Sequence, residues 1–129
     1  MATLINVFSV APHRQSELIA LLVHATEETM KHQPGFICAN FHASQDGERV
    51  INYAQWESEE HYQAMLANPE ARVHMDEAAT IATDVQPRLF RVESTHTAYR
   101  AVLESRAADG LPSDPLPPTC ARDGRGRAV

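Results

Sequence analysis

The order of hydrophobic and polar residues along the chain predicts four β-strands and two helical segments. Short stretches rich in aliphatic, aromatic and β-branched residues, bounded by turn-forming residues, are expected as strands. Apolar residues that recur at helical spacing predict the helices. The expected strands cover residues 3–10, 36–44, 49–57 and 85–95, and the expected helices cover residues 14–32 and, broken at Asn68-Pro69, 58–82.

This order of elements is that of the split βαβ motif. It predicts a ferredoxin-like α+β fold, in which an antiparallel sheet carries its helices on one face. Asp46-Gly47 is expected to form the hairpin turn between the two middle strands, because this dipeptide accepts positive φ angles. Ser58 is expected to be the N-cap of the broken helix, with Glu59 and Glu60 in its first turn.

Each predicted helix has one apolar side, which is expected to pack on the sheet. After the break, His74 falls on this apolar side, although histidine is polar. The apolar positions are Leu18, Leu22, Ala25 and Thr29 in the first helix, Tyr62, Met65 and Leu66 before the break, and Ala71, Met75, Ala78, Ile81 and Ala82 after it.

Neither face of the first three predicted strands is clearly polar. In the first strand, Leu4 and Phe8 lie on one face, while Ile5 and Val7 lie on the other. Helices can cover only one face, and an antiparallel sheet with a face in water usually alternates apolar with polar residues. We therefore expect a homodimer, in which the sheet of a second subunit covers the other face as in a dimeric α/β barrel.

Composition and charge argue against some classes of binding partner. The chain has 129 residues, of which 43% are hydrophobic and 22% charged, as in an ordinary globular protein. Its net charge of -6 argues against binding to nucleic acid or to an anionic membrane surface. No apolar run approaches the roughly 20 residues that span a bilayer, and the N-terminus lacks a secretory signal pattern. We expect a cytoplasmic protein.

The composition changes towards the C-terminus. Residues 1–97 are expected to form a single domain, and residues 98–129 a C-terminal extension. The extension begins with a short predicted helix, over residues 98–106. Proline, glycine and arginine then dominate and large apolar residues are scarce, so this part is expected to be a disordered tail or an extended arm.

The predicted strand over residues 49–57 carries the first candidate site residues. The pleat of a strand places Asn52 and Trp56, the only tryptophan, on the same face, where both offer hydrogen-bond donors in apolar surroundings. Trp56 is either a core anchor or part of a site. Asn52 either satisfies the hydrogen bonds of a strand edge or faces a ligand. Asn6 is a further inward candidate, and Asn40 and His42 are expected near the pocket edge. No spacing of histidine, cysteine or acidic residues predicts a metal site.

Several short motifs resemble the antibiotic biosynthesis monooxygenase family, and within it the anthrone monooxygenases of the actinorhodin type. The motifs are Gln33-Pro34-Gly35-Phe36, His42-Ala43-Ser44, Asp46-Gly47 and the run Asn52-Tyr53-Ala54-Gln55-Trp56-Glu57-Ser58-Glu59. The resemblance implies a dimeric ferredoxin-like protein with a pocket between sheet and helices. It also implies oxidation of a polycyclic aromatic polyketide, of the anthrone or naphthacenone type, to a quinone by O₂ without metal, flavin or haem.

The resemblance assigns roles to several residues. It implies that Asn52 and Trp56 are catalytic, as hydrogen-bond donors to a developing oxyanion. The family's pocket tyrosine maps onto Tyr62, which is expected to bind the substrate. From their inward positions in the predicted elements, Asn6, Met65 and His74 are expected to bind it as well. A helix arginine of the actinorhodin-type enzymes does not carry over, because Met75 takes its place beside His74, and Arg72 points away from the apolar side. His74 is therefore either the proton acceptor, for which its ordinary pKa is suited, or a buried structural residue.

Three other functions remain open at this point. The first is a ring-opening oxygenase of an angucycline-type pathway, which would need reduced flavin. The second is haem degradation, which the sequence disfavours because Met65 stands where such relatives have a second tryptophan. The third is a non-catalytic small-molecule binding domain, since a fold does not fix a function.

Overall fold

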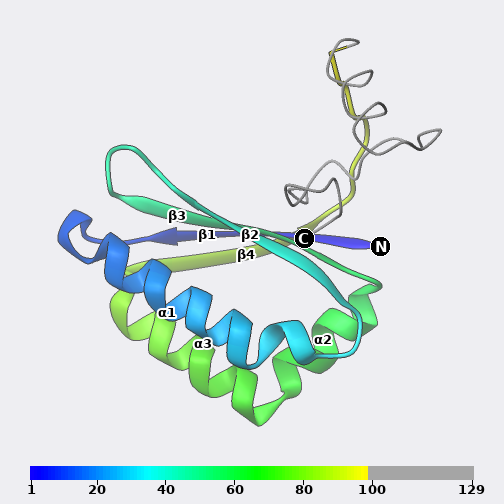
Figure 1. The fold of residues 1–129 in the computed structure, drawn as a ribbon, viewed down its shortest axis with the longest axis horizontal. Helices are drawn as coiled ribbons and strands as arrows, with labels where there is room; N and C mark the ends of the chain where they lie inside the picture. The colour runs from blue at the N-terminus through cyan, green and yellow to red at the C-terminus, as the bar shows by residue number, and fades with distance from the viewer. Residues whose placement is uncertain (99–129) are drawn as a thin grey trace.

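The computed structural model describes residues 1–98, which form a four-stranded antiparallel sheet with helices on one face (Figure 1). The strands are paired in the order β2-β3-β1-β4, as in a ferredoxin-like fold. The predicted features of the extension after residue 98 lie outside the described residues. The elements are β1 (Ala2–Ser9), η1 (Pro12–Arg14), α1 (Gln15–Glu28), η2 (Met30–His32), β2 (Phe36–Ala43), β3 (Arg49–Trp56), α2 (Glu59–Ala67), α3 (Pro69–Ile81) and β4 (Asp84–Phe90).

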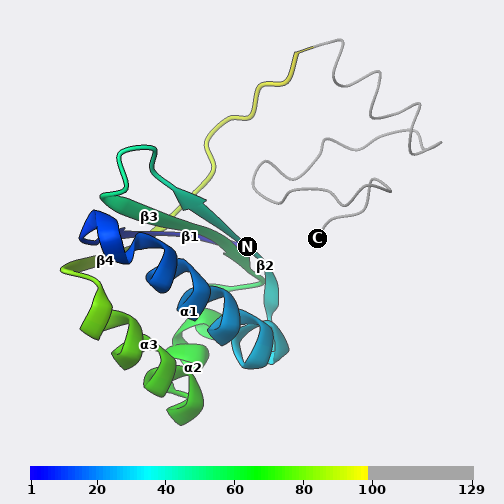
Figure 2. The same cartoon turned by 60° about the vertical axis from the view of Figure 1, so that its left-hand side comes forward.

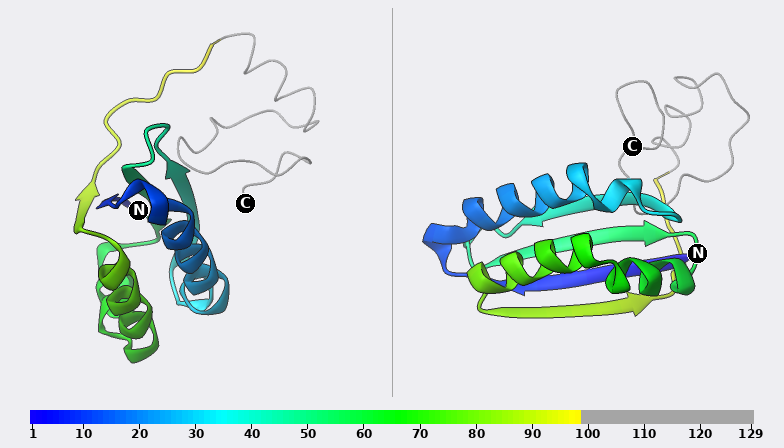
Figure 3. Two further views of the ribbon diagram at one scale, coloured as in Figure 1. Left: turned by 90° about the vertical axis from the view of Figure 1, so that its left-hand side faces the viewer. Right: turned by 90° about the horizontal axis from the view of Figure 1, so that it is seen from below.

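The helices form a layer beneath the sheet. Helices α1 and α3 run side by side along the strands, and α2 lies at one end of α3, as Figures 2 and 3 show. The break between α2 and α3 is at the predicted place, because the Asn68 side chain caps α3 and Pro69 is its first residue. Ser58 caps α2 as predicted, with its Oγ accepting from the His61 backbone N–H at 3.2 Å.

Two glycines have positive φ angles and allow the chain to turn. Gly47 has a φ of 79° in the hairpin between β2 and β3, which confirms the predicted turn. Gly35 has a φ of 83° just before β2, and a Cβ at this position would lie 2.3 Å from the His61 ring. The Gly35 carbonyl also accepts from the Glu57 backbone N–H at 2.7 Å, so the start of β2 is tied to the segment that leads into α2.

The register of the sheet determines which side chains meet beneath it. Strand β1 lies between β3 and β4, and its Asn6 is directly opposite Asn52 of β3. The residues around this pair on the helix-facing side are apolar, including Leu4, Phe8 and Ala54. They belong to two packed clusters, one around Trp56 at the end of the sheet near α2, and one around Leu18 at the N-terminal end of α1. The core therefore continues on both sides of the two asparagines.

Strand β2 contains a bulge that sequence alternation did not predict. Simple alternation along this strand would place Phe36 and Cys38 on one face and Ala39 and Phe41 on the other. The pairing with β3 shifts between Phe36 and Cys38, so that Phe36, Ala39 and Phe41 all face the helices.

The bulge overturns the expected positions of two polar residues. Asn40 and His42 pair with Tyr53 and Ile51 of β3, on the face that points away from the helices. The prediction that they lie near the pocket edge is therefore wrong.

Two element boundaries also differ from the predicted ones. Helix α1 ends at Glu28, and the chain continues to His32 as the short 3₁₀ turn η2. Strand β4 ends at Phe90 and does not reach residue 95. Its Pro87 lies on an edge strand, as expected for a residue that has no backbone N–H.

Candidate active site

A cavity lies between the helix-facing side of the sheet and the three α-helices. It has two adjoining lobes, both partly open to solvent, and the empty space of about 590 Å³ in each includes solvent at its mouth. The donor lobe is the part lined by Asn52 and Trp56, and the histidine lobe is the part lined by His74. The two lobes share one set of lining residues: Asn6, Phe8, Leu22, Ala25, Met30, Tyr62, Leu66 and Met75.

Asn52 and Trp56 meet in the donor lobe, as their spacing in β3 predicted. Trp56 is 2% exposed, and its ring makes edge contacts with Phe36 at 5.4 Å and with Tyr62 at 6.2 Å between ring centroids. Neither the Trp56 indole N–H nor the Asn52 side-chain oxygen has a hydrogen-bond partner within residues 1–98. Buried polar groups normally do have one, so both groups are available to a ligand.

Asn6 adds a second amide beside Asn52, on the neighbouring strand. The two residues are cross-strand partners on one face, and Asn6 lines both lobes. Its side-chain oxygen is buried and also lacks a partner in the described part of the chain. Oxygen and nitrogen of an asparagine amide exchange places by a flip, so each amide can offer a donor or an acceptor.

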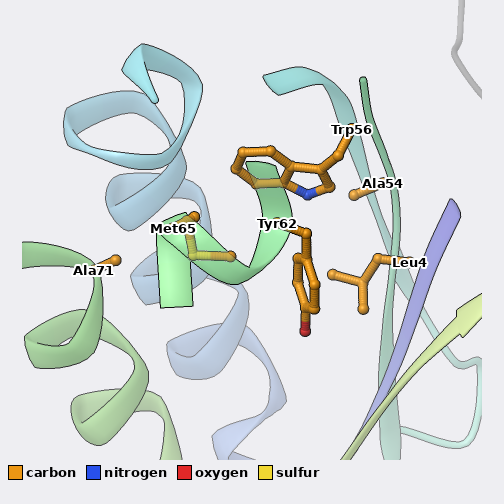
Figure 4. Close-up of a cluster of buried hydrophobic side chains, with 6 residues drawn as sticks. All are labelled: Leu4, Ala54, Trp56, Tyr62, Met65 and Ala71. Atoms are coloured by element: carbon orange, nitrogen blue, oxygen red, sulfur yellow. The ribbon is translucent and has the colours of Figure 1, made fainter. Parts of the chain in front are cut away.

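Tyr62 and Met65 reach the site from α2. Figure 4 shows the Tyr62 ring beside Leu4 and Ala54 of the sheet, with its hydroxyl pointing away from Trp56. Tyr62 is 6% exposed, and this burial raises the pKa of its phenol above the ordinary value, so the phenol remains a neutral donor at physiological pH. Met65 is 7% exposed and lines the donor lobe. Both side chains are placed where the helical pattern predicted.

His74 projects from α3 into the histidine lobe. Its Nε2 is 3.0 Å from the Thr29 hydroxyl, and the edge of its ring packs against His24 of α1 at 6.1 Å between centroids. Its other ring nitrogen, Nδ1, is buried and has no partner among residues 1–98. The neighbouring Arg72 is exposed and donates to the Leu66 carbonyl, so it points away from the apolar side as expected.

Thr29 was not singled out as a functional residue from the sequence. Its position on the apolar face of the first helix predicted burial, and it is 5% exposed. Its contact with His74 joins the C-cap of α1 to α3, through residues 45 positions apart in sequence, which no local pattern could show. Three other histidines lie away from the cavity: His13 and His32 are exposed, and His61 packs on Gly35 and bonds Ser58.

The lining is apolar apart from a few neutral polar groups. Neither lobe is lined by an acidic residue, lysine or arginine within the described residues. Residues 1–98 contain no group of three His, Cys, Asp or Glu side chains that could hold a metal ion. None of their helices is long and apolar enough to cross a membrane. Such a cavity suits a flat apolar ligand that is oriented by a small number of hydrogen bonds.

Comparison with known proteins identifies relatives of this chain. The chain is 46% identical over 95 residues to the tetracenomycin F1 monooxygenase of Streptomyces glaucescens, covering 74% of this chain and 82% of that one. The ActVA-Orf6 monooxygenase of Streptomyces coelicolor, whose crystal structure holds nanaomycin D, matches with a TM-score of 0.70 and 27% identity over 75% of this chain and 91% of that one.

A third relative supports the fold alone. The structure of SnoaB, a cofactor-independent oxygenase from Streptomyces nogalater, matches with a TM-score of 0.64 and 23% identity, covering 73% of this chain and 94% of that one. Together with the two closer similarities, it confirms the predicted ferredoxin-like fold. The two closer similarities confirm the prediction of a monooxygenase. Residues 1–77, more than half of the chain, match the antibiotic biosynthesis monooxygenase family. The chain therefore belongs to the antibiotic biosynthesis monooxygenase family.

Proposed function

We propose that this monooxygenase uses O₂, without a cofactor, to oxidise a polycyclic aromatic polyketide of the anthrone or naphthacenone type to a quinone. The observation that carries the proposal is the pair of buried, unpartnered polar groups on Asn52 and Trp56 in an otherwise apolar cavity. Support also comes from the relatives, one of which is a tetracenomycin F1 monooxygenase and one a cofactor-independent oxygenase.

The substrate itself supplies the electrons in this reaction. Loss of a proton from the CH₂ group between the rings gives a delocalised anion, which passes one electron to O₂. The two radicals combine to a peroxide anion, which takes up a proton to give a hydroperoxide, and loss of water from the hydroperoxide leaves a carbonyl group. One oxygen atom enters the quinone and the other leaves as water, so the reaction balances without a further reductant.

Asn52 and Trp56 stabilise the anion in this proposal. The Asn52 amide, flipped so that its NH₂ takes the place of the unpartnered oxygen, and the Trp56 indole N–H both donate to the substrate oxygen on which negative charge develops. Pre-positioned donors of this kind each contribute about 3 kcal/mol of transition-state stabilisation. Asn6, Tyr62, Met65 and His74 contact the substrate as binding residues. That His74 accepts the proton stays a prediction, because His74 lines the lobe that Asn52 and Trp56 do not line.

A turnover assay tests this function. The purified protein, free of added cofactor, is incubated in air with dithranol or a naphthacenone, and quinone formation is followed by absorbance. We expect catalysis above background, and about a hundredfold loss in kcat for Asn52→Ala and for Trp56→Phe, which keeps the aromatic ring but removes the N–H.

The control variant is Gln63→Ala, which removes an amide from the exposed side of α2 and should retain the wild-type rate. Unchanged turnover in both Asn52→Ala and Trp56→Phe would contradict the proposed roles. Turnover only with added reduced flavin would favour the ring-opening reaction, and a new Soret band on titration with haem would favour haem chemistry.

We further propose that two subunits pair through the sheet face that the helices leave uncovered. Ile5, Val7, Ile51 and Tyr53 occupy this face and are only half-buried in the single chain. Phe90 lies on the same face, opposite Thr3, and is 47% exposed. A second sheet packed there would remove these apolar side chains from water.

A further inference from the structure

We propose that the histidine lobe is a subsite for the end of the aromatic substrate that is remote from the reacting carbon. In this subsite His74, positioned by Thr29, forms a hydrogen bond to an oxygen substituent on the remote ring, either a phenol hydroxyl or a carboxylate. The inference rests on the proposed function, because it assumes that the reacting carbon lies beside Asn52 and Trp56.

The first argument is the shape of the cavity. The donor lobe lies against β3, while the histidine lobe extends between α1, α3 and β4 and is lined by Ala78, Val85 and Pro87. Both lobes are lined by Asn6, Tyr62 and Met75, so they adjoin. A ligand that fills both lobes therefore meets different polar groups at its two ends.

The second argument is the chemistry of the histidine lobe. Its polar lining groups are Asn6 and Tyr62, which it shares with the donor lobe, and His74, which it does not share. The buried Nδ1 of His74 has no hydrogen-bond partner within the described residues. A neutral or protonated imidazole can bond a phenol or a carboxylate, so an oxygen substituent on the substrate would satisfy this nitrogen.

The third argument is that Thr29 holds the imidazole ring in place. Its hydroxyl lies 3.0 Å from His74 Nε2, which leaves Nδ1 as the nitrogen available to a ligand. Thr29 is 5% exposed, its backbone N–H donates to the Ala25 carbonyl at 3.0 Å, and its own carbonyl accepts from Gln33 Nε2 at 3.3 Å. A β-branched side chain on such a fixed backbone has few rotamers. Thr29 is thus a positioning residue for His74.

The test compares two substrates that differ only at the remote end. One is unsubstituted 5(12H)-naphthacenone, and the other carries a hydroxyl or carboxyl group on its terminal ring away from the CH₂. Steady-state kinetics are measured for the wild type, for Thr29→Val, which is nearly isosteric but lacks the hydroxyl, and for Thr29→Ser, which keeps it. Thr80→Val removes a hydroxyl from the exposed side of α3 and serves as the control.

For the substituted substrate, we expect Thr29→Val to raise KM about tenfold, the typical effect of one lost hydrogen bond, with kcat within twofold of wild type. The unsubstituted substrate should show no change, Thr29→Ser should restore the wild-type KM, and His74→Gln should also lose the preference for the substituted substrate. A fall in the kcat of His74→Gln with both substrates would instead assign His74 to proton transfer. A KM for the substituted substrate that is the same in the wild type and in all variants would likewise overturn the subsite.

Binding can be measured without turnover, since Trp56 is the only tryptophan of the chain and lines the donor lobe. Quenching of its fluorescence by the corresponding quinones gives a Kd for each variant. A tenfold weaker Kd of Thr29→Val for the substituted quinone alone supports the subsite, even if no naphthacenone is oxidised and the proposed function fails. Unchanged Kd values contradict it, whether or not the enzyme turns over.

Discussion

The side chains in the cavity differ in how far their positions and partners could be predicted from the sequence. Asn52, Trp56, Tyr62 and Met65 follow from periodicity within one strand or one helix, and the structure places them on the cavity. The contact of Thr29 with His74 depends on how two separate helices pack, which local periodicity does not contain. For these residues, the sequence predicted the face that each occupies but not its partner on another element.

The buried phenol of Tyr62 makes a prediction about alkaline pH. Burial raises its pKa in the folded protein, whereas in the unfolded chain it titrates near 10. Above about pH 10 the unfolded state therefore binds fewer protons than the folded state, and stability falls as the pH rises through this range. Thermal unfolding measured between pH 8 and 11.5 should show a shallower alkaline decline for Tyr62→Phe than for wild type.

The same titration can be followed in the folded protein. Tyrosinate absorbance at 295 nm should show a late step that Tyr62→Phe removes and that Tyr53→Phe leaves in place. A late step that persists in Tyr62→Phe would show that another tyrosine carries the raised pKa.

At the scale of elements, turns and caps were predictable because their signals are local. Ser58, Asn68-Pro69 and Asp46-Gly47 each act within a few residues, and the structure confirms all three. The bulge in β2 and the early end of β4 were not predicted, because both depend on pairing with another strand. One unpredicted bulge was enough to move Asn40 and His42 from the expected face to the opposite one.

Gly35 connects the start of β2 to the position of α2. We expect Gly35→Ala to destabilise the protein by about 2 kcal/mol or more, because φ is positive and the new Cβ would meet His61 ring atoms at 2.3 and 2.6 Å. Relief of this clash would displace His61, and Tyr62 beside it, so the rate of quinone formation should fall as well.

Gly47→Ala is the matched comparison, since its φ is also positive but the nearest atom, Pro12 Cβ, is 3.2 Å away. Urea unfolding of this variant should show a cost of about 1 kcal/mol, from backbone strain, with activity retained. Equal losses of stability in the two variants would argue that the contact with His61 has no role.

For the whole molecule, the fold could be predicted because the order of elements allows few topologies. The helices cover only one face of the sheet, so the other face needs a different cover. The proposed dimer extends this reasoning. Sedimentation velocity at micromolar concentration should show a particle of twice the chain mass. Ile51→Asp places a charge on the uncovered face and should produce monomers.

Val73→Asp is the control for the dimer, because Val73 is 56% exposed on α3, away from the sheet. It should sediment as the wild type does. A wild-type protein that remains monomeric at these concentrations would rule out the proposed pairing.

The two outermost strands have a consequence for solubility. An exposed strand edge is a template for pairing with another chain, and proteins protect it with proline or a bulge. Here β4 carries Pro87 in its middle, and β2 carries the bulge between Phe36 and Cys38. Both edges of the sheet thus discourage repeated strand addition and the fibrils that it produces, in agreement with the proposed dimer, whose subunits associate through the broad face of the sheet.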